Sequence, residues 1–451
     1  IVTGNVTLNN PSLDINTTGV PDGGRIVFNN PIDGTTAGAQ SLTLNSSGNG
    51  TITLKDVGNS VPLGNLTIKG LSKQELAGNY TTTNNQTFEN EITLIGSVTF
   101  NAGGAIAFNN PIKSNGDYAI AVTANQNITT KEIVAPGGIT LTSTNGSISS
   151  TGILDSSSSF GNGGPIQLTA KSGTITTGNV SAISVNGGNG GDVTFIAGNG
   201  IATGDIFAQV LEPSDTSQAG AIALTTPNGN ITTGNLSASS GFGGSLKGNT
   251  ITLTADNGSI TTANIDTSST GGGGDITLIA GTSITTDGIT TDSSSQNGGA
   301  IALTAKNGNI IAGNVNASSF DGNGGAIAFN ATGNIITRGV GVENPPPDIF
   351  SFSISGNGGP ITLISSAGFI DTSAGKIDST SAIGKGGEIT LTASATGSKI
   401  IAGDIFSNGI PGSGNITLTA DELDLVGGIQ RQPEVTLEGG SFGTTAGKST
   451  I

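Results

Sequence analysis

A motif of the form Gly-Gly-x-Ile-x-Leu returns about every 27 residues through most of this chain. Successive copies lie 25 to 34 residues apart, and the first apolar position of each is Ile139, Ile166, Val193, Ile222, Ile251, Ile276, Ile301, Ile327, Ile361, Ile389 and Ile416. A regular period of this length is typical of stacked-repeat proteins, in which each repeat packs mainly against its two neighbours. We therefore expect one repeat array rather than several globular domains.

Each period contains three short apolar segments. Ile166, Leu168 and Ala170 alternate with polar residues, which is typical of a strand with one buried face. Two shorter segments follow at Ile175 and Val180, and Gly, Ser and Asn turns separate all three. The pattern predicts an all-β fold, a right-handed parallel β-helix (solenoid) with three short strands per coil of about 27 residues. The right-handed sense is expected because parallel crossover connections are overwhelmingly right-handed.

Other repeat architectures fit the sequence poorly. Gly contributes 75 of the 451 residues, Thr, Ser and Asn are also abundant, and all four are weak helix formers. Apolar residues show no helical spacing, so helical repeats are excluded. A β-propeller blade needs about 40–45 residues, which is longer than the observed period.

The regularity of the pattern divides the chain into three parts. Residues 136–419 carry regular β-helix repeats, and residues 420–451 form a terminal coil or cap. Residues 1–135 have looser spacing, and we interpret them as less regular coils of the same helix; a separate β-sandwich is the alternative. Because the chain lacks an initiating Met and ends without an obvious terminus, truncation is expected at both ends.

Composition excludes several functions. The chain has no Cys or His, so catalysis or metal binding through either residue is impossible, and we expect no cofactor and no metal site. The formal charge is −16 without a basic patch, which argues against nucleic-acid binding. No apolar run is long enough for a membrane-spanning helix, so no membrane insertion is expected. Carboxylate pairs remain conceivable as a catalytic device.

Asn or Asp recurs at one turn of successive repeats. Stacked side-chain amides bond to one another and to the backbone in such positions, so we interpret the row as a structural turn ladder and not as a catalytic site. Its members are Asn179, Asp205, Asn235, Asn264, Asn314 and Asp404.

An insertion interrupts the regular repeats and explains the 34-residue step. Insertions in solenoids form loops on one face, often the binding face. We therefore select this stretch as a candidate contact loop, and a tolerated surface insertion is the alternative. The residues are Pro345, Pro346, Pro347, Ile349, Phe350 and Phe352.

Three phrases resemble the coils of filamentous-haemagglutinin-type adhesins, the exoproteins of two-partner secretion. They are the Gly-Gly-[AEDP]-Ile-[AT]-Leu-[TI]-Ala repeats at Gly299–Ala305 and Gly387–Ala393, the phrase Ile416–Gly428, and Leu63–Ile68. The resemblance implies a right-handed β-helix, secretion through an outer-membrane partner, and adhesion at the bacterial cell surface. The Asn-Pro-Asn-Gly motifs of the family's secretion domain are not found, so the resemblance is to the shaft region.

The sequence therefore predicts a non-enzymatic structural shaft of a secreted bacterial adhesin or extracellular surface filament. End-to-end self-association is expected because an uncapped coil exposes backbone groups that another coil can pair. A host or matrix glycan or protein is the expected partner. The alternative is a polysaccharide-acting β-helical enzyme or a carbohydrate-binding module. A carboxylate-lined cleft with Lys or Arg on adjacent coils would favour the enzyme.

Overall fold

The computed structural model describes residues 1–17, 24–46, 48, 50–212, 217–241, 247–338, 348–430, 435–438 and 441–443. The chain forms two compact units. The amino-terminal unit comprises residues 1–158, 162–182 and 191–204, and the carboxy-terminal unit comprises residues 159–161, 183–190 and 205–451. Every strand pairing in the described residues is parallel, and in each unit the strands fall into three columns that follow one another along the chain.

The amino-terminal unit builds its columns from strands β1–β21, β23 and β24. The first column contains β1 (Val6–Leu8), β4 (Ile32–Gly34), the ends of β8 (Lys73–Thr82) and β10 (Ile92–Ala102), β13 (Ile120–Ala124), β16 (Ile139–Ser143), β19 (Ile166–Ala170) and β23 (Val193–Ala197). The second contains β2 (Ser12–Asn16), β5 (Ser41–Ser46), β7 (Leu66–Gly70), β9 (Gln86–Phe88), β11 (Ile106–Phe108), β14 (Ile128–Thr130), β17 (Ile148–Ser150), β20 (Ile175–Thr176) and β24 (Ile201–Ala202). The third contains β3 (Ile26–Val27), β6 (Thr51–Leu54), the starts of β8 and β10, β12 (Ile112–Ser114), β15 (Ile133–Val134), β18 (Leu154–Asp155) and β21 (Val180–Ser181).

The carboxy-terminal unit has the same three-column plan. The first column contains β27 (Ile222–Thr226), β30 (Ile251–Ala255), β33 (Ile276–Ala280), β35 (Ile301–Ala305), β37 (Ile327–Ala331), β40 (Ile361–Ser365), β43 (Ile389–Ala393), β46 (Ile416–Thr419) and β49 (Val435–Glu438). The second contains β28 (Ile231–Thr232), β31 (Ile260–Thr262), the starts of β34 (Ile284–Thr290) and β36 (Ile310–Asn316), β38 (Ile335–Thr337), β41 (Ile370–Thr372), β44 (Lys399–Ala402), β47 (Glu422–Leu425) and β50 (Ser441–Gly443). The third contains β25 (Ile206–Phe207), β29 (Leu236–Ser237), β32 (Ile265–Asp266), the ends of β34 and β36, β39 (Ile349–Phe350), β42 (Ile377–Asp378), β45 (Ile405–Phe406) and β48 (Ile429–Gln430), and a separate pair joins β22 (Ser184–Asn186) to β26 (Val210–Glu212).

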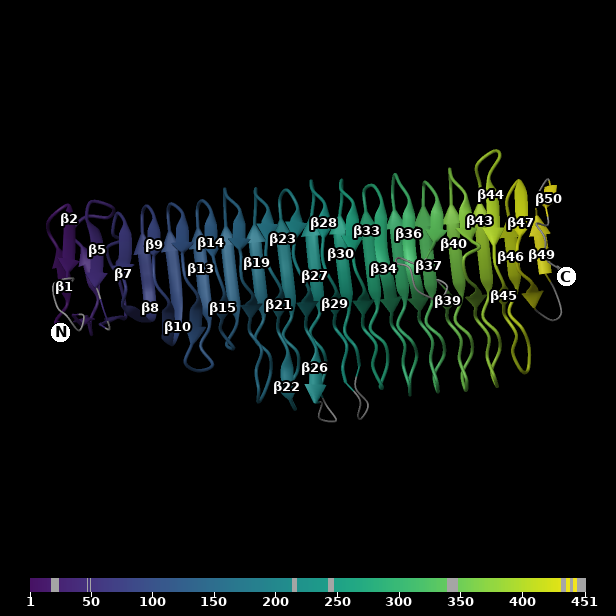
Figure 1. The fold of residues 1–451 in the computed structure, drawn as a ribbon, viewed down its shortest axis with the longest axis horizontal. Coiled ribbons are helices and arrows are strands. Elements are labelled where there is room, and N and C mark those ends of the chain that lie inside the picture. The colour runs from purple at the N-terminus through teal and green to yellow at the C-terminus, as the bar shows by residue number, and fades with distance from the viewer. Residues whose placement is uncertain are drawn as a thin grey trace. The chain divides into compact units, whose positions relative to one another are not determined.

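The repeat motif sets the register of the first column. In the amino-terminal unit Ile139 pairs with Ile166, and Ile166 pairs with Val193. In the carboxy-terminal unit the isoleucines of β27, β30, β33, β35, β37, β40, β43 and β46 pair in the same way, and Figure 1 shows successive strands lying side by side. The predicted parallel β-solenoid is thus confirmed, with about 15 coils of about 26 residues. The right-handed sense stays a prediction.

Alternation of side chains gives each unit a narrow apolar interior. The inward-facing isoleucines and leucines of the three columns are almost entirely buried except in the first coil, while the residues between them, which are mostly polar, face outward. The early coils of the amino-terminal unit contain aromatic residues instead: Tyr80 and Phe100 stack in the first column, and Phe88 and Phe108 in the second, with ring centroids 5.0 and 5.1 Å apart. The Tyr80 hydroxyl donates to the Leu54 carbonyl at 3.0 Å, and burial raises the pKa of Tyr80.

The Gly-Gly pair of the motif is required by close backbone packing where each coil closes. A Cβ atom on Gly325 would lie less than 3.0 Å from the carbonyl oxygen of Gly299 in the preceding coil. A buried hydroxyl bridges this closure from inside, as where Thr291 Oγ1 donates to the Gly299 carbonyl at 2.7 Å. Because backbone meets backbone here, no flexible side chain can move aside to accommodate a methyl group.

We expect Gly325→Ala to destabilise the carboxy-terminal unit by about 1–3 kcal/mol, the usual effect of overpacking. Gly412→Ala is the matched control, because nothing lies within 4 Å of a Cβ atom built there. Urea unfolding followed by circular dichroism measures both changes. Equal effects of the two substitutions would contradict the packing explanation.

Two fully buried glutamines of the amino-terminal unit differ in their hydrogen bonding. Gln74 sits between Ile52 and Ile92 in the third column, is fully buried, and has no hydrogen-bond partner for either amide atom among the described residues. Gln86 is equally buried, but its Nε2 donates to the carbonyls of Tyr80 at 3.0 Å and Asn101 at 2.8 Å. An unpaired buried amide opposes folding, whereas a bonded one contributes to it.

We therefore expect Gln74→Leu to raise the free energy of unfolding by about 1–3 kcal/mol, because the apolar side chain removes an unsatisfied polar group from the core. Gln86→Leu should lower it, because two backbone carbonyls lose their donor. Chemical denaturation of both variants tests the pair, and a loss of stability in Gln74→Leu would show that the amide has a partner such as a buried water.

Candidate functional site

The residues predicted to form a turn ladder lie where the second column turns into the third. In the carboxy-terminal unit, Asp205 Oδ1 accepts hydrogen bonds from the backbone N and Nδ2 of Asn235 at 2.7 and 3.1 Å. Asn235 Oδ1 accepts the corresponding bonds from Asn264, both at 3.2 Å. The side-chain oxygens thus accept hydrogen bonds from backbone amides of the next coil, at a turn where strand pairing does not satisfy those amides.

The row changes composition beyond Asn264. The next coil has Gly288, and the coil after that has Asn314, whose Oδ1 accepts from the Asp348 backbone N at 3.1 Å. Asp404 Oδ1 similarly accepts from the Gly428 backbone N at 2.6 Å. Asn179 belongs to the other unit, where its carbonyl accepts from the Leu154 backbone N at 3.0 Å. The side-chain bonds of this row therefore go to backbone amides of the next coil and, at Asn235 and Asn264, to the side-chain amide as well.

The candidate contact loop is described only in part. Pro345, Pro346 and Pro347 lie outside the described residues. Ile349 is fully buried in the third column, so its side chain cannot reach a partner. Phe350 and Phe352 are half-buried on the outer face, with ring centroids 6.1 Å apart.

Lys376 completes this aromatic cluster from the following coil. Its Nζ lies 4.8 Å from the centroid of the Phe350 ring, a cation–π contact. The same Nζ lies 3.9 Å from Asp378 Oδ2. Lys376 therefore already covers part of the Phe350 ring, and the surface that remains exposed is small and contains both polar and apolar groups.

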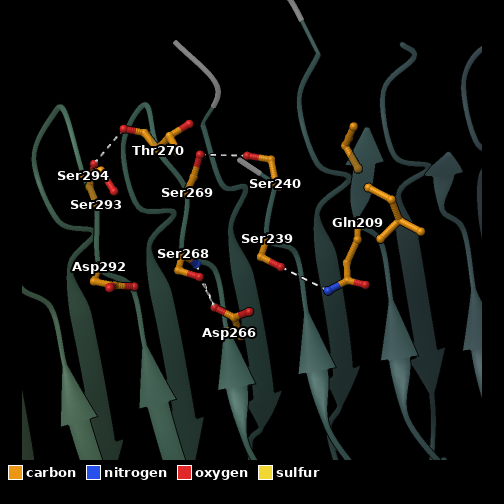
Figure 2. Close-up of a pocket in the computed structure, with 13 residues that line it drawn as sticks. Gln209, Ser239, Ser240, Asp266, Ser268, Ser269, Thr270, Asp292, Ser293 and Ser294 are labelled. Atoms are coloured by element: carbon orange, nitrogen blue, oxygen red, sulfur yellow. Dashed lines mark hydrogen bonds between the residues drawn. The ribbon is translucent and has the colours of Figure 1, made fainter. Parts of the chain in front are cut away.

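A cleft that sequence reasoning did not identify lies just beyond the third column of the carboxy-terminal unit. Its volume is about 300 Å³, and Figure 2 shows the residues that line it. They are Gln209, Val210, Leu211, Ser239, Ser240, Gly241, Asp266, Ser268, Ser269, Thr270, Asp292, Ser293 and Ser294. Four successive coils contribute to this set.

The in-register stacking of the strands continues into the cleft and arranges its side chains in rows. Because Ile206 pairs with Leu236, Leu236 with Ile265 and Ile265 with Ile289, the residues three positions later also align across the coils. This outer row consists of Gln209, Ser239, Ser268 and Asp292. A deeper row of buried serines, Ser240, Ser269 and Ser293, lies one residue further along.

Hydrogen bonds hold the outer row in place. Gln209 Nε2 donates to Ser239 Oγ at 3.1 Å and to Ser237 Oγ at 2.7 Å. Asp266 Oδ1 accepts from the backbone N and the hydroxyl of Ser268 at 2.9 and 2.6 Å. In the deeper row, the Ser240 and Ser269 hydroxyls lie 2.7 Å apart. Hydrogen bonds therefore fix the hydroxyl and amide groups of these rows and the carboxylate of Asp266.

The two carboxylates in the cleft have different environments. Asp266 is stabilised as an anion by the two bonds from Ser268. Asp292 receives no such bond from another described side chain, and burial raises its pKa, with a further increase from the negative charge of Asp266. Among the described residues that line the cleft, no Lys or Arg offsets either charge. The enzyme alternative predicts carboxylates together with a Lys or Arg on adjacent coils. The described residues of this cleft include the carboxylates but not the cation.

The cleft was missed because its residues belong to low-complexity Ser-rich stretches after the third strand. Asp266 and Asp292 each begin such a stretch, as Asp-Thr-Ser-Ser and Asp-Ser-Ser-Ser. One available signal was the return of Asp followed by serines in two neighbouring periods. The offset of two residues between the two acids could be seen only after the register of the short third strands was known.

Comparisons with known proteins do not assign this site. The sequence matches no protein-family model, and neither curated proteins nor solved structures gave a match. Within the described ranges, no three acidic side chains gather as they would around a metal ion. The same ranges contain no helix long and apolar enough to cross a membrane.

The raised pKa of Asp292 predicts how stability depends on pH. The folded state holds the Asp292 proton more tightly than the unfolded state, so this residue lowers stability as the pH rises above the ordinary Asp value of 3.8. Asp292→Asn cannot ionise and should therefore gain stability relative to the wild type between about pH 3 and pH 7.

Urea midpoints measured across that range test the prediction. Asp266→Asn supplies a second check, because removing the neighbouring negative charge should bring the pKa of Asp292 down towards its ordinary value, as read by carboxyl NMR titration. A stability difference between wild type and Asp292→Asn that does not change with pH would contradict the prediction.

Proposed function

We propose that this protein is a non-enzymatic structural shaft of a secreted bacterial adhesin or extracellular surface filament. The observation that carries the proposal is the in-register stacking of near-identical coils within each unit. Successive first-column strands of the carboxy-terminal unit pair residue for residue, as with Ile251, Ile276 and Ile301. Such an array extends a surface by repetition and distributes load over many equivalent hydrogen bonds.

The first coil of the amino-terminal unit supports end-to-end association. Leu13 and Ile15 are in register with Leu42 and Leu44 of the next coil. The latter two are 1% and 0% exposed, whereas Leu13 and Ile15 are only half-buried, because described residues cover them on one side alone. The strand β2 that carries them pairs with β5, and among the described residues no strand pairs with its other edge. A further coil can add to this edge by the same parallel hydrogen bonding, and in the proposed filament a second copy supplies it.

The remaining parts of the proposal rest on the family resemblance. It places the protein at the bacterial cell surface after secretion through an outer-membrane partner, with a host or matrix glycan or protein as the contacted surface. The composition is compatible with this setting, since a chain without cysteine has no thiol to be oxidised outside the cell.

Electron microscopy of the purified 451-residue chain tests the proposed filament. We expect rods joined end to end, with an average length that increases with protein concentration. Leu13→Lys should reduce the joining, because a charge placed on the uncovered apolar face must be buried at the junction. Asp14→Lys is the matched control, since Asp14 lies in the same strand and its exposed side chain points outward.

Sedimentation velocity gives the same comparison in solution. Joining that is lost in Leu13→Lys and retained in Asp14→Lys supports end-to-end assembly through the first coil. Isolated particles at all concentrations, or equal joining in the two variants, would overturn this part of the proposal.

A further inference from the structure

We propose that the cleft lined by Asp266 and Asp292 is a binding site for a short uncharged oligosaccharide. The proposed shaft function does not assign any ligand to this cleft, and the inference does not depend on filament formation. It rests on the cavity itself, on the chemistry of its wall, and on the way in which four coils present that wall in register.

The size of the cleft limits what it can hold. Its volume of about 300 Å³ is at the lower end of the range for small-molecule sites, so a protein segment with folded structure is too large. The outer row crosses four coils, which gives it a length of about 14 Å at ~4.8 Å per step. An elongated cavity of this size fits a few linked sugar rings lying along the coil axis.

The wall of the cleft matches the hydrogen-bonding pattern of a sugar. Each sugar hydroxyl is both a donor and an acceptor, and the cleft offers groups of both kinds: hydroxyls of Ser239 and Ser268, the amide of Gln209, and the carboxylates of Asp266 and Asp292. A carboxylate accepts from two adjacent hydroxyls of one ring, which is a strong charge-assisted contact. All of these groups except Asp292 are held in place by the bonds described above, so little ordering of them is needed on binding.

The cleft also has an apolar side. Leu211 is 49% exposed although it follows the buried Val210, so its side chain is available at the cavity edge. A sugar ring presents C–H groups on its face, and a leucine beside a polar row can cover them. This combination of polar and apolar groups is typical of sites for small polar ligands.

The charge of the cleft selects among sugars. The described lining residues include two carboxylates and no cation, so a uronic acid would be repelled, whereas a neutral or amine-bearing sugar would not. A calcium ion is the competing ligand. It takes 6–8 oxygen ligands, usually including several carboxylates, and Asp266 already shares one oxygen with Ser268. The hydroxyl-rich wall favours the sugar, and calcium is included as an outcome of the test.

The experiment uses the full chain and defined probes. Isothermal titration calorimetry would be run with tetrasaccharides of β-linked glucose, mannose, galactose and N-acetylglucosamine, with tetragalacturonate, and with calcium chloride. We expect at least one uncharged tetrasaccharide to bind and tetragalacturonate not to bind. Asp266→Asn and Asp292→Asn should each weaken binding by about tenfold to a hundredfold, as expected for loss of a charged hydrogen-bond acceptor.

Asp378→Asn is the matched control. Asp378 occupies the same row of the third column as Asp266 and accepts a similar bond, from the Thr380 backbone N at 3.0 Å, but it lies outside the cleft. Its replacement should leave affinity within about twofold of the wild type. Thermal melts of all three variants establish that each is folded.

Three results would overturn the inference: no uncharged tetrasaccharide binds, calcium alone binds, or folded Asp266→Asn and Asp292→Asn bind as well as Asp378→Asn. Because the filament test depends on Leu13 and the sugar test on Asp266 and Asp292, failure of one proposal leaves the other measurable. Binding by isolated particles would support the sugar site while the filament proposal failed.

Discussion

The hydrogen bonds between parallel strands of successive coils are the interaction on which the structure depends. A single coil has only a few inward side chains, whose burial cannot offset the conformational entropy of ordering about 26 residues. Stacking changes this balance, because each added coil covers the apolar face of the previous one and pairs its backbone groups. In the middle of each unit the inward-facing isoleucines are covered by a neighbouring coil on both sides and are almost fully buried.

The same stacking explains the unusual composition of the chain. Where a coil closes, backbone atoms of adjacent coils approach so closely that only Gly fits, as at Gly299 and Gly325. Where a coil turns between its second and third strands, side chains such as Asn235 bond the amides of the next coil. Polar residues are thus abundant because each coil has three corners, and each corner contains backbone groups that strands do not pair.

The sequence predicted the architecture well because its signal was repeated many times. One strand of five residues would be ambiguous, but a motif that returned eleven times with the same alternation indicated a buried column, and the register of Ile139, Ile166 and Val193 confirmed it. The cleft gave no comparable signal. The cleft depends on the offset between Asp266 and Asp292 in two neighbouring coils. This offset follows from the register in which β32 pairs with β34, and no pattern within a single period specifies that register. The contact loop was difficult to predict for a different reason. Ile349 lies in an insertion and was expected to be accessible to a partner, but its side chain is buried in the core.

Because successive coils are equivalent, the number of coils in such a molecule can change during evolution. Since the isoleucines of β30, β33 and β35 occupy equivalent positions, removal of the coil that begins with β33 would bring two matching faces together with their register intact. Duplication of a coil would be equally compatible. Unequal genetic recombination can therefore lengthen or shorten the array in whole steps, whereas the gain or loss of a single residue within a strand would reverse which side chains face the interior.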